Sequence, residues 1–155
     1  MPDKLRYNPN FVPVELDDGD EYMPNGIFIF NITKMIADIR ANPQSYNKHK
    51  ISVAAYRTGY AKLDEEHIPN VDLSIPIIAA EIRPGAYTAI DGRHRLEKAY
   101  RQGVTELEAY LLPPEQHTRF LTTTKGYEAY IQYWNSKIDD DVNDRKRKDS
   151  GNMNS

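Results

Sequence analysis

The chain has 155 residues, enough for one domain with a sizeable core but hardly for two. It contains no cysteine, which excludes disulfides, zinc–thiolate sites, iron–sulfur clusters and thiol chemistry. Its 20 basic and 23 acidic residues give a formal net charge of -3, which excludes a strongly basic nucleic-acid coat but not a local basic site. No apolar run is long enough to span a membrane and no secretory signal is visible, so we expect no membrane partner and a cytoplasmic location.

Residues 1–25 are predicted to form an extended acidic arm. Four prolines interrupt this segment, and five acidic residues lie close together near its end. They are Glu15, Asp17, Asp18, Asp20 and Glu21. Prolines and mutually repelling carboxylates disfavour regular structure, so we expect an extended arm that is either wrapped on the body or solvated and open to a protein partner.

A strand and a helix are predicted next. Residues 26–31 are β-branched and aromatic, as in a short strand. Thr33 is expected to cap a helix with apolar residues at helical spacing, which ends before Asn42 and Pro43. The polar stretch 44–70 predicts one further helix around 53–62.

The middle of the chain predicts a hairpin followed by a helix. The nearly continuous apolar run 75–82 is typical of a strand covered on both faces. Turn residues at 83–85 and a second strand at 86–90 complete the hairpin. Asp91-Gly92 breaks the second strand, and a helix is predicted over 93–102.

The last part of the chain predicts a strand, two helices and a tail. The strand covers 107–112, and the helices cover 115–121 and 127–138. The second helix carries an aromatic stripe that we expect to pack on the core rather than to stack on bases. Residues 139–155 lack apolar periodicity and predict a disordered tail, in which four consecutive basic residues lie among five acids. We expect residues 26–138 to form an α/β (α+β) domain, a small mixed sheet flanked by helices.

The helix at 93–102 concentrates positive charge. Four of the 20 basic residues lie between Arg93 and Arg101, and Arg93, His94 and Arg95 occupy the first turn. Cations at a helix N-terminus oppose the macrodipole by roughly 0.3–1 kcal/mol each unless an anion lies among them. Gly92 would let a ligand approach the backbone, and arginine binds phosphate through two nitrogens, so phosphate is the best candidate ligand.

A surface helix with internal ion pairs explains the same charges without a ligand. Glu97 can pair with Arg93 or Arg101 at i,i+4 spacing, and Asp91 can cap the helix or pair with an arginine. The spacing alone leaves both interpretations open.

The order strand, Asp-Gly-Arg-His-Arg, amphipathic helix, glycine and strand over 72–112 resembles the ParB/sulfiredoxin-like superfamily. In sulfiredoxins the equivalent turn reads Gly-Cys-His-Arg and binds ATP phosphates. In ParB proteins it reads Gly-Glu-Arg-Arg and binds CTP phosphates, and a free-serine kinase branch has Asp-Gly-His-His-Arg. The resemblance implies a nucleotide-phosphate site at Gly92, Arg93, His94 and Arg95.

The chain departs from two branches of that superfamily. Arg93 stands where sulfiredoxins have their nucleophilic cysteine, which excludes sulfinic-acid repair. Against ParB, Arg93 and His94 replace the Glu and the first Arg of the turn, and neither a Glu-Asn-x-Gln-Arg segment nor a helix-turn-helix domain follows Leu112. These departures argue against a partition protein.

Hydrolysis of a nucleoside triphosphate or phosphoryl transfer at this turn would require a carboxylate, to hold Mg²⁺ or to act as a base. The candidates are Asp72 as a metal ligand and Glu81 and Asp91 as catalytic groups. Glu81 lies in an apolar run, so it should be functional or paired with Arg83 or Arg93. His94 could donate to phosphate or exchange protons near neutral pH, whereas His49, His67 and His117 lack ligand spacing and are expected on the surface.

Three functions stay open on the sequence. The first is a ParB-like domain that binds a nucleotide phosphate at Gly92–Arg95, with Mg²⁺-dependent NTP hydrolysis or phosphoryl transfer as its activity. The second is a DNA-associated or nuclease-like accessory protein, which would bind nucleic acid. The third is a non-catalytic protein-interaction module that uses the arm or the tail.

Overall fold

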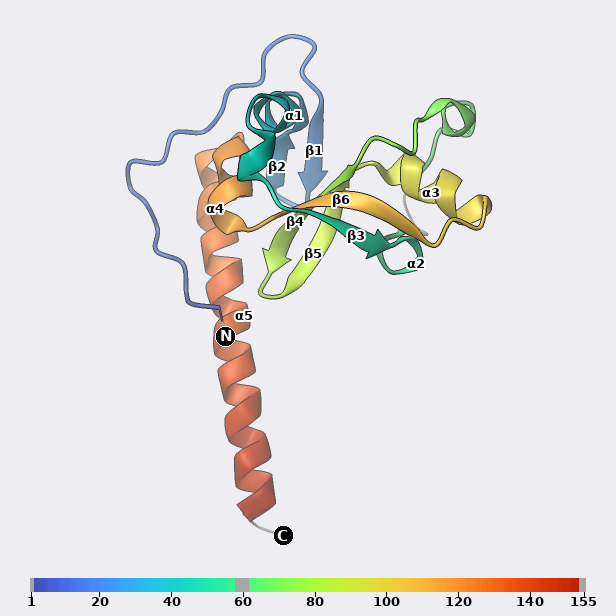
Figure 1. Ribbon diagram of the computed structural model, residues 1–155. Helices are drawn as coiled ribbons and strands as arrows, with labels where there is room; N and C mark the ends of the chain where they lie inside the picture. Colours follow the sequence, from blue (N-terminus) through green and yellow to red (C-terminus); the bar gives the residue numbers. More distant parts are fainter. Residues whose placement is uncertain (1, 58–61, 154–155) are drawn as a thin grey trace.

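A four-stranded mixed sheet lies at the centre of the molecule (Figure 1). The computed structural model describes residues 2–57 and 62–153. The strand order is β3 (Lys48–Ser52), β6 (Glu106–Leu112), β4 (Ile77–Arg83) and β5 (Ala86–Asp91). β4 runs parallel to β6 and antiparallel to β5, and β6 runs antiparallel to β3. This arrangement confirms the predicted α+β class and its small mixed sheet.

The two faces of the sheet bury different sets of residues, because side chains alternate along each strand. One face packs against α1 (Ile32–Ala41), β2 (Phe28–Asn31) and α5 (Thr124–Met153); we call it the α5 face. The other packs against α2 (Val53–Tyr56) and α3 (Arg93–Arg101); we call it the α3 face. In β4, Ile78, Ala80 and Ile82 belong to the α5 face and Ile77 to the α3 face, so this strand is buried on both sides as its apolar run predicted.

A second, two-stranded sheet begins inside the predicted arm. β1 (Tyr22–Asn25) pairs with β2 in antiparallel register, so the arm gives way to a strand at Tyr22. α1 then begins two residues earlier than a cap at Thr33 predicts. Its cap is Asn31, whose Oδ1 accepts from the backbone N–H of Lys34 at 3.0 Å, and not Thr33, whose hydroxyl accepts from the N–H of Glu21.

The stretch 44–70 differs most from its prediction. β3 was not expected, since among its five residues only Ile51 is buried and no apolar alternation marks it. The helix predicted over 53–62 is shortened to α2, which ends at Tyr56, and positions 58–61 lie outside the described residues. Short 3₁₀ turns at Pro43–Ser45 and Ile68–Asn70 make up part of the remainder.

The hairpin and the helix after it are confirmed, with β4, β5 and α3 each within two residues of the predicted bounds. β6 likewise matches the predicted strand at 107–112. The helix expected over 115–121 is divided into α4 (Pro114–His117) and a 3₁₀ turn over Thr118–Phe120.

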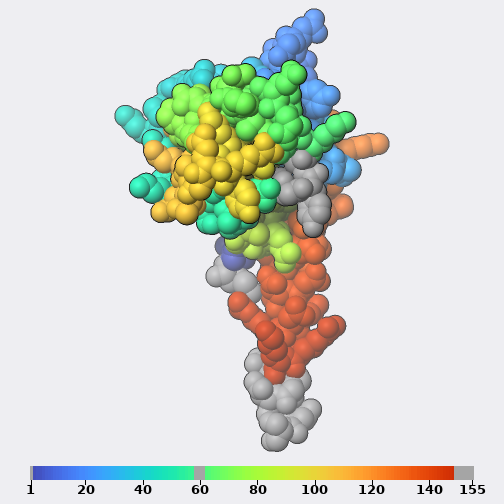
Figure 2. All heavy atoms as spheres, turned by 90° about the vertical axis from the view of Figure 1, so that its right-hand side faces the viewer, coloured from blue at the N-terminus to red at the C-terminus, as the bar shows by residue number. Residues whose placement is uncertain are grey.

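Helix α5 continues far beyond the body of the molecule. It contains the predicted helix at 127–138 and runs on to Met153, so the prediction of a disordered tail is corrected up to that residue. Elongating a helix that packing has already nucleated costs much less than starting one, which explains how a polar segment can extend it. Figure 2 shows this part as a stem that projects from the body. Among the described residues, no helix is both long and apolar enough to span a membrane.

The N-terminal segment is wrapped on the body and lies along α5 (Figure 1). The side-chain amide of Asn135 bonds both the N–H and the carbonyl of Leu5, at 2.8 and 2.9 Å. The indole N–H of Trp134 donates to the carbonyl of Asp3, and Phe11 stacks on Tyr127 with ring centroids 4.0 Å apart. The segment before β1 is therefore part of the packed structure.

Candidate functional site

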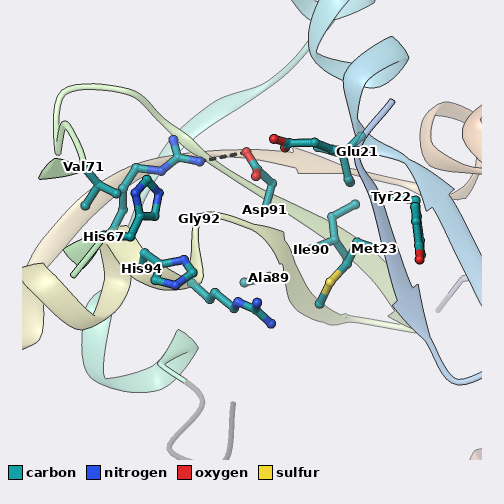
Figure 3. Close-up of a pocket in the computed structure, with 13 residues that line it drawn as sticks. Glu21, Tyr22, Met23, His67, Val71, Ala89, Ile90, Asp91, Gly92 and His94 are labelled. Carbon is teal, nitrogen blue, oxygen red and sulfur yellow. Dashed lines mark hydrogen bonds and ion pairs between the residues drawn. The ribbon is translucent and has the colours of Figure 1, made fainter. Parts of the chain in front are cut away.

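A pocket of about 340 Å³ lies where the N-terminus of α3 faces β1. Figure 3 shows Gly92 and His94 on one side of it and Glu21, Tyr22 and Met23 on the other. Its lining comes from four parts of the chain: Glu21–Met23 with Ile32, His67 with Val71, Ala89 with Ile90, and Asp91 through Arg95. The predicted turn thus opens into a cavity, and β1 supplies the opposite wall.

Gly92 is required by the internal packing of the turn. It precedes α3 with φ of 107°, a left-handed conformation that favours glycine. A Cβ on this residue would lie 2.5 Å from Cγ2 of Ile77, which is fully buried. We expected Gly92 to let a ligand approach the backbone closely. In the structure, the group that lies close to this backbone is the side chain of Ile77, on the α3 face.

Arg95 is committed to the fold. Its side chain is buried, and one terminal nitrogen donates to the carbonyls of Ile75 and Pro76, both at 2.8 Å. The other donates to the carboxylate of Asp91 at 2.7 Å, the ion pair dashed in Figure 3. Asp91 pairs with an arginine, as one interpretation expected, and makes no capping bond to the helix. Both groups line the pocket, but their principal hydrogen-bonding atoms are already engaged.

The remaining charges along α3 form structural contacts as well. The carboxylate of Glu97 is buried and pairs with Arg57 at 2.5 Å and with Arg101 at 2.9 Å. Hydrogen bonding to Arg57, and then to Arg101, lowers the pKa of Glu97 against the opposing effect of burial. Arg101 also makes two bonds to Glu65, and the ammonium of Lys98 donates to two backbone carbonyls between α3 and the segment before β4. Ion pairs and hydrogen bonds within the fold therefore account for most of the charged side chains of α3.

Arg93 is the exception. It lies in the first turn of α3, its side chain is exposed, and it makes no ion pair or side-chain hydrogen bond with any other residue that the structure describes. The first helical bond runs from the N–H of Leu96 to the carbonyl of Gly92, so the N–H groups of residues 93–95 precede the helical ladder. No acidic residue occupies this first turn.

His94 lines the pocket beside His67, with the two rings edge to face at 5.0 Å (Figure 3). Its Nε2 accepts a hydrogen bond from the backbone N–H of Asp64 at 3.1 Å, so this nitrogen carries no proton. Burial lowers the pKa of His94, with smaller contributions in the same direction from Arg93 and His67 and an opposing one from Asp64. The accepted hydrogen bond and the lowered pKa both favour the neutral form of the imidazole.

Two predicted carboxylates do not line the pocket. Glu81 is 9% exposed, but its carboxylate accepts from the N–H of Gly85 in the hairpin turn at 2.8 Å, and it is paired with neither Arg83 nor Arg93. Asp72 accepts from the N–H and the hydroxyl of Ser74, which lowers its pKa. Each carboxylate stabilises a local turn.

One acidic side chain of the pocket was not predicted. Glu21 lines it, and Figure 3 shows its side chain reaching over the cavity toward Asp91. Its only sequence signal was the acidic run before residue 22, which says nothing of the strand pairing that places it. Within the described ranges, no group of three or more potential ligand side chains is placed to hold a metal ion. Asp72, the residue expected to hold Mg²⁺, lies outside the lining of this pocket, and a Mg²⁺ site at the turn stays a prediction.

His117 lies outside the pocket and corrects another prediction. It is fully buried rather than on the surface, with Nε2 at 2.9 Å from the carbonyl of Glu81 and 3.1 Å from the hydroxyl of Tyr130. Its Nδ1 has no hydrogen-bond partner among the described residues. Burial lowers the pKa of His117 to about 4.

Comparisons of this chain with protein-family models, with curated proteins and with solved structures found no match. The resemblance to the ParB/sulfiredoxin-like superfamily therefore stays a prediction, carried by the turn at Gly92–Arg95.

Proposed function

We propose that the pocket at the N-terminus of α3 binds the phosphate group of a small ligand, and that this ligand is a nucleotide, as the resemblance of the turn suggests. The observation that carries the proposal is Arg93. Among the cations of α3, Arg95, Lys98 and Arg101 make contacts within the fold, whereas Arg93 lines the cavity without a partner among the described residues.

The surroundings of Arg93 favour an anion. Backbone N–H groups of the first turn and the positive end of the helix dipole are available to a phosphate oxygen. A guanidinium can hold two such oxygens at once, with roughly twice the strength of a neutral hydrogen bond. Glu21 on the opposite wall repels an anion, so the pocket suits a ligand whose phosphate lies on the α3 side and whose neutral part faces β1.

No catalytic step is proposed. Of the carboxylates expected to hold Mg²⁺ or to act as a base, Asp72 and Glu81 lie outside the pocket lining, and Asp91 lines the pocket but is paired with Arg95. NTP hydrolysis and phosphoryl transfer remain predictions drawn from the resemblance. Phosphate binding needs only the groups described above.

Thermal unfolding with inorganic phosphate, AMP and ATP, each with and without Mg²⁺, tests the proposal. A ligand at 100 times its dissociation constant stabilises the folded protein by about 2.7 kcal/mol. Arg93→Gln should weaken binding by about tenfold or more, because a bond to a charged group contributes roughly 1.5–3 kcal/mol. Glu21→Gln should strengthen it. Arg83→Gln is the matched control, since Arg83 is also exposed but lies outside the pocket.

Two results would contradict the proposal. One is the absence of a shift with phosphate and with both nucleotides. The other is equal loss of binding in the Arg93 and Arg83 variants, which would indicate general charge screening. Salt-dependent binding of DNA in place of nucleotides would favour the nucleic-acid alternative.

A further inference from the structure

A second pocket, of about 510 Å³, shares Asp91 and Arg95 with the first. It opens beside the C-terminal half of α1. Its other lining residues are Ile36, Ile39, Arg40, Pro43, Ile75, Pro76, Ile78 and Tyr110. Asp91 and Arg95, joined by their ion pair, are thus common to the walls of two separate cavities.

The walls of this second pocket are mainly apolar. Seven of its ten lining side chains belong to isoleucine, proline or tyrosine. Ile39 and Ile78 are buried in the core, whereas Ile75 is 48% exposed. An apolar cavity with few polar groups, within the 300–1,000 Å³ typical of ligand sites, suits one small organic molecule better than a protein segment.

The charged groups of this pocket leave one positive charge. Arg95 and Asp91 neutralise each other at 2.7 Å. Arg40 lies in the last turn of α1, is exposed, and forms no ion pair or side-chain hydrogen bond with another residue in the described part of the chain. A ligand in the cavity would therefore meet apolar walls and the guanidinium of Arg40, which is unpaired among the described residues.

We propose that this pocket binds a hydrophobic monocarboxylate, with its hydrocarbon part against the isoleucines and prolines and its carboxylate on Arg40. A carboxylate is ionised at neutral pH and matches the planar guanidinium with two parallel hydrogen bonds. Its single charge equals the charge left in the pocket. The proposal is independent of phosphate binding at the N-terminus of α3.

The test compares 3-phenylpropanoate with its neutral analogue 3-phenylpropanamide, titrated into the full chain at pH 7 and followed by calorimetry and by protein NMR shifts. The acid should bind at least about tenfold more tightly than the amide, since its charged bond is lost in the analogue. Arg40→Gln should abolish this preference, whereas the control Arg83→Gln should preserve it. Ile75→Ser should weaken the acid and the amide alike, because it removes exposed apolar wall without disturbing the core.

Five outcomes would overturn the proposal. Four of them are no saturable binding of the acid, equal affinity for acid and amide, an unchanged preference in a folded Arg40→Gln protein, and association of two copies through this face in sedimentation. Displacement of the acid by inorganic phosphate would also overturn it, because it would place both ligands at one site. Phosphate binding that survives any of these results leaves the proposed function intact.

Discussion

The two faces of the central sheet are stabilised by different means. The α5 face buries large aromatic side chains, among them Phe30, Tyr130 and Trp134. The α3 face buries mainly aliphatic side chains in a smaller cluster, and α3 is also tied to its neighbours by ion pairs and by bonds from lysine and arginine to backbone carbonyls. Most charged side chains of α3 thus attach this helix to its neighbours. Within the described part of the chain, Arg93 is the one cation of α3 without such a contact, and the functional interpretation is limited to it.

The largest expected effect belongs to the α5 face and concerns pH. The pKa of His117 is lowered to about 4 in the folded state, against about 6.5 in the unfolded chain. Its contribution to stability should be present above pH 6.5 and be lost as the pH falls toward 4, by on the order of 3 kcal/mol. Denaturant unfolding at pH 7 and pH 4 measures this loss.

The matched variants are His117→Phe and His49→Gln. The first removes the titrating ring from the α5 face and should flatten the pH dependence, whatever it does to stability at pH 7. The second alters an exposed histidine of β3 and should leave the dependence unchanged. An equally steep loss in His117→Phe would show that the acid-sensitive group lies elsewhere.

The next effect belongs to the ion pairs of the α3 face. Glu97→Gln should lower the free energy of unfolding by about 1.5–3 kcal/mol, since a buried acceptor of charged hydrogen bonds is weakened. Glu108→Gln breaks an exposed pair with Lys48 at 3.3 Å and should cost less than about 1 kcal/mol. If Glu97→Gln and Glu108→Gln lowered the free energy of unfolding by similar amounts, the buried ion pairs of α3 would be no more stabilising than an exposed surface pair.

The smallest effect separates packing from backbone strain at the turn. Gly92 and Gly103 both have positive φ, but an added Cβ meets Ile77 only at Gly92 and meets nothing within 4 Å at Gly103. Gly92→Ala should therefore cost about 1–3 kcal/mol more than Gly103→Ala, as overpacked sites do. Equal costs in thermal unfolding would mean that φ alone requires a glycine before α3.

Strong local patterns in the sequence were enough to predict the hairpin, α3 and β6. The apolar run at 75–82 and the break at Asp91-Gly92 are local signals, and the structure follows them. β3 gave no such signal, because a polar strand with one buried residue acquires its structure from pairing with β6. α5 extends past its apolar stripe because packing of the stripe nucleates the rest.

The candidate site was predictable in position but not in the partners of its residues. The charges at 93–101 marked a turn that lines a cavity in the structure, yet the choice between ligand and ion pair depends on groups distant in sequence. Ile75 and Pro76 occupy Arg95, and Arg57 approaches Glu97 from 40 residues away. Glu81 likewise found its partner in a backbone N–H, which residue type does not reveal.

The contacts between the N-terminal segment and α5 also constrain the order of folding. Leu5 bonds Asn135 across 130 residues, and Asp3 accepts from Trp134 across 131. Contacts of such sequence separation are slow to form, because the chain must close a long loop before they contribute. During synthesis, residues 3–5 can reach their native positions only after α5 has been translated.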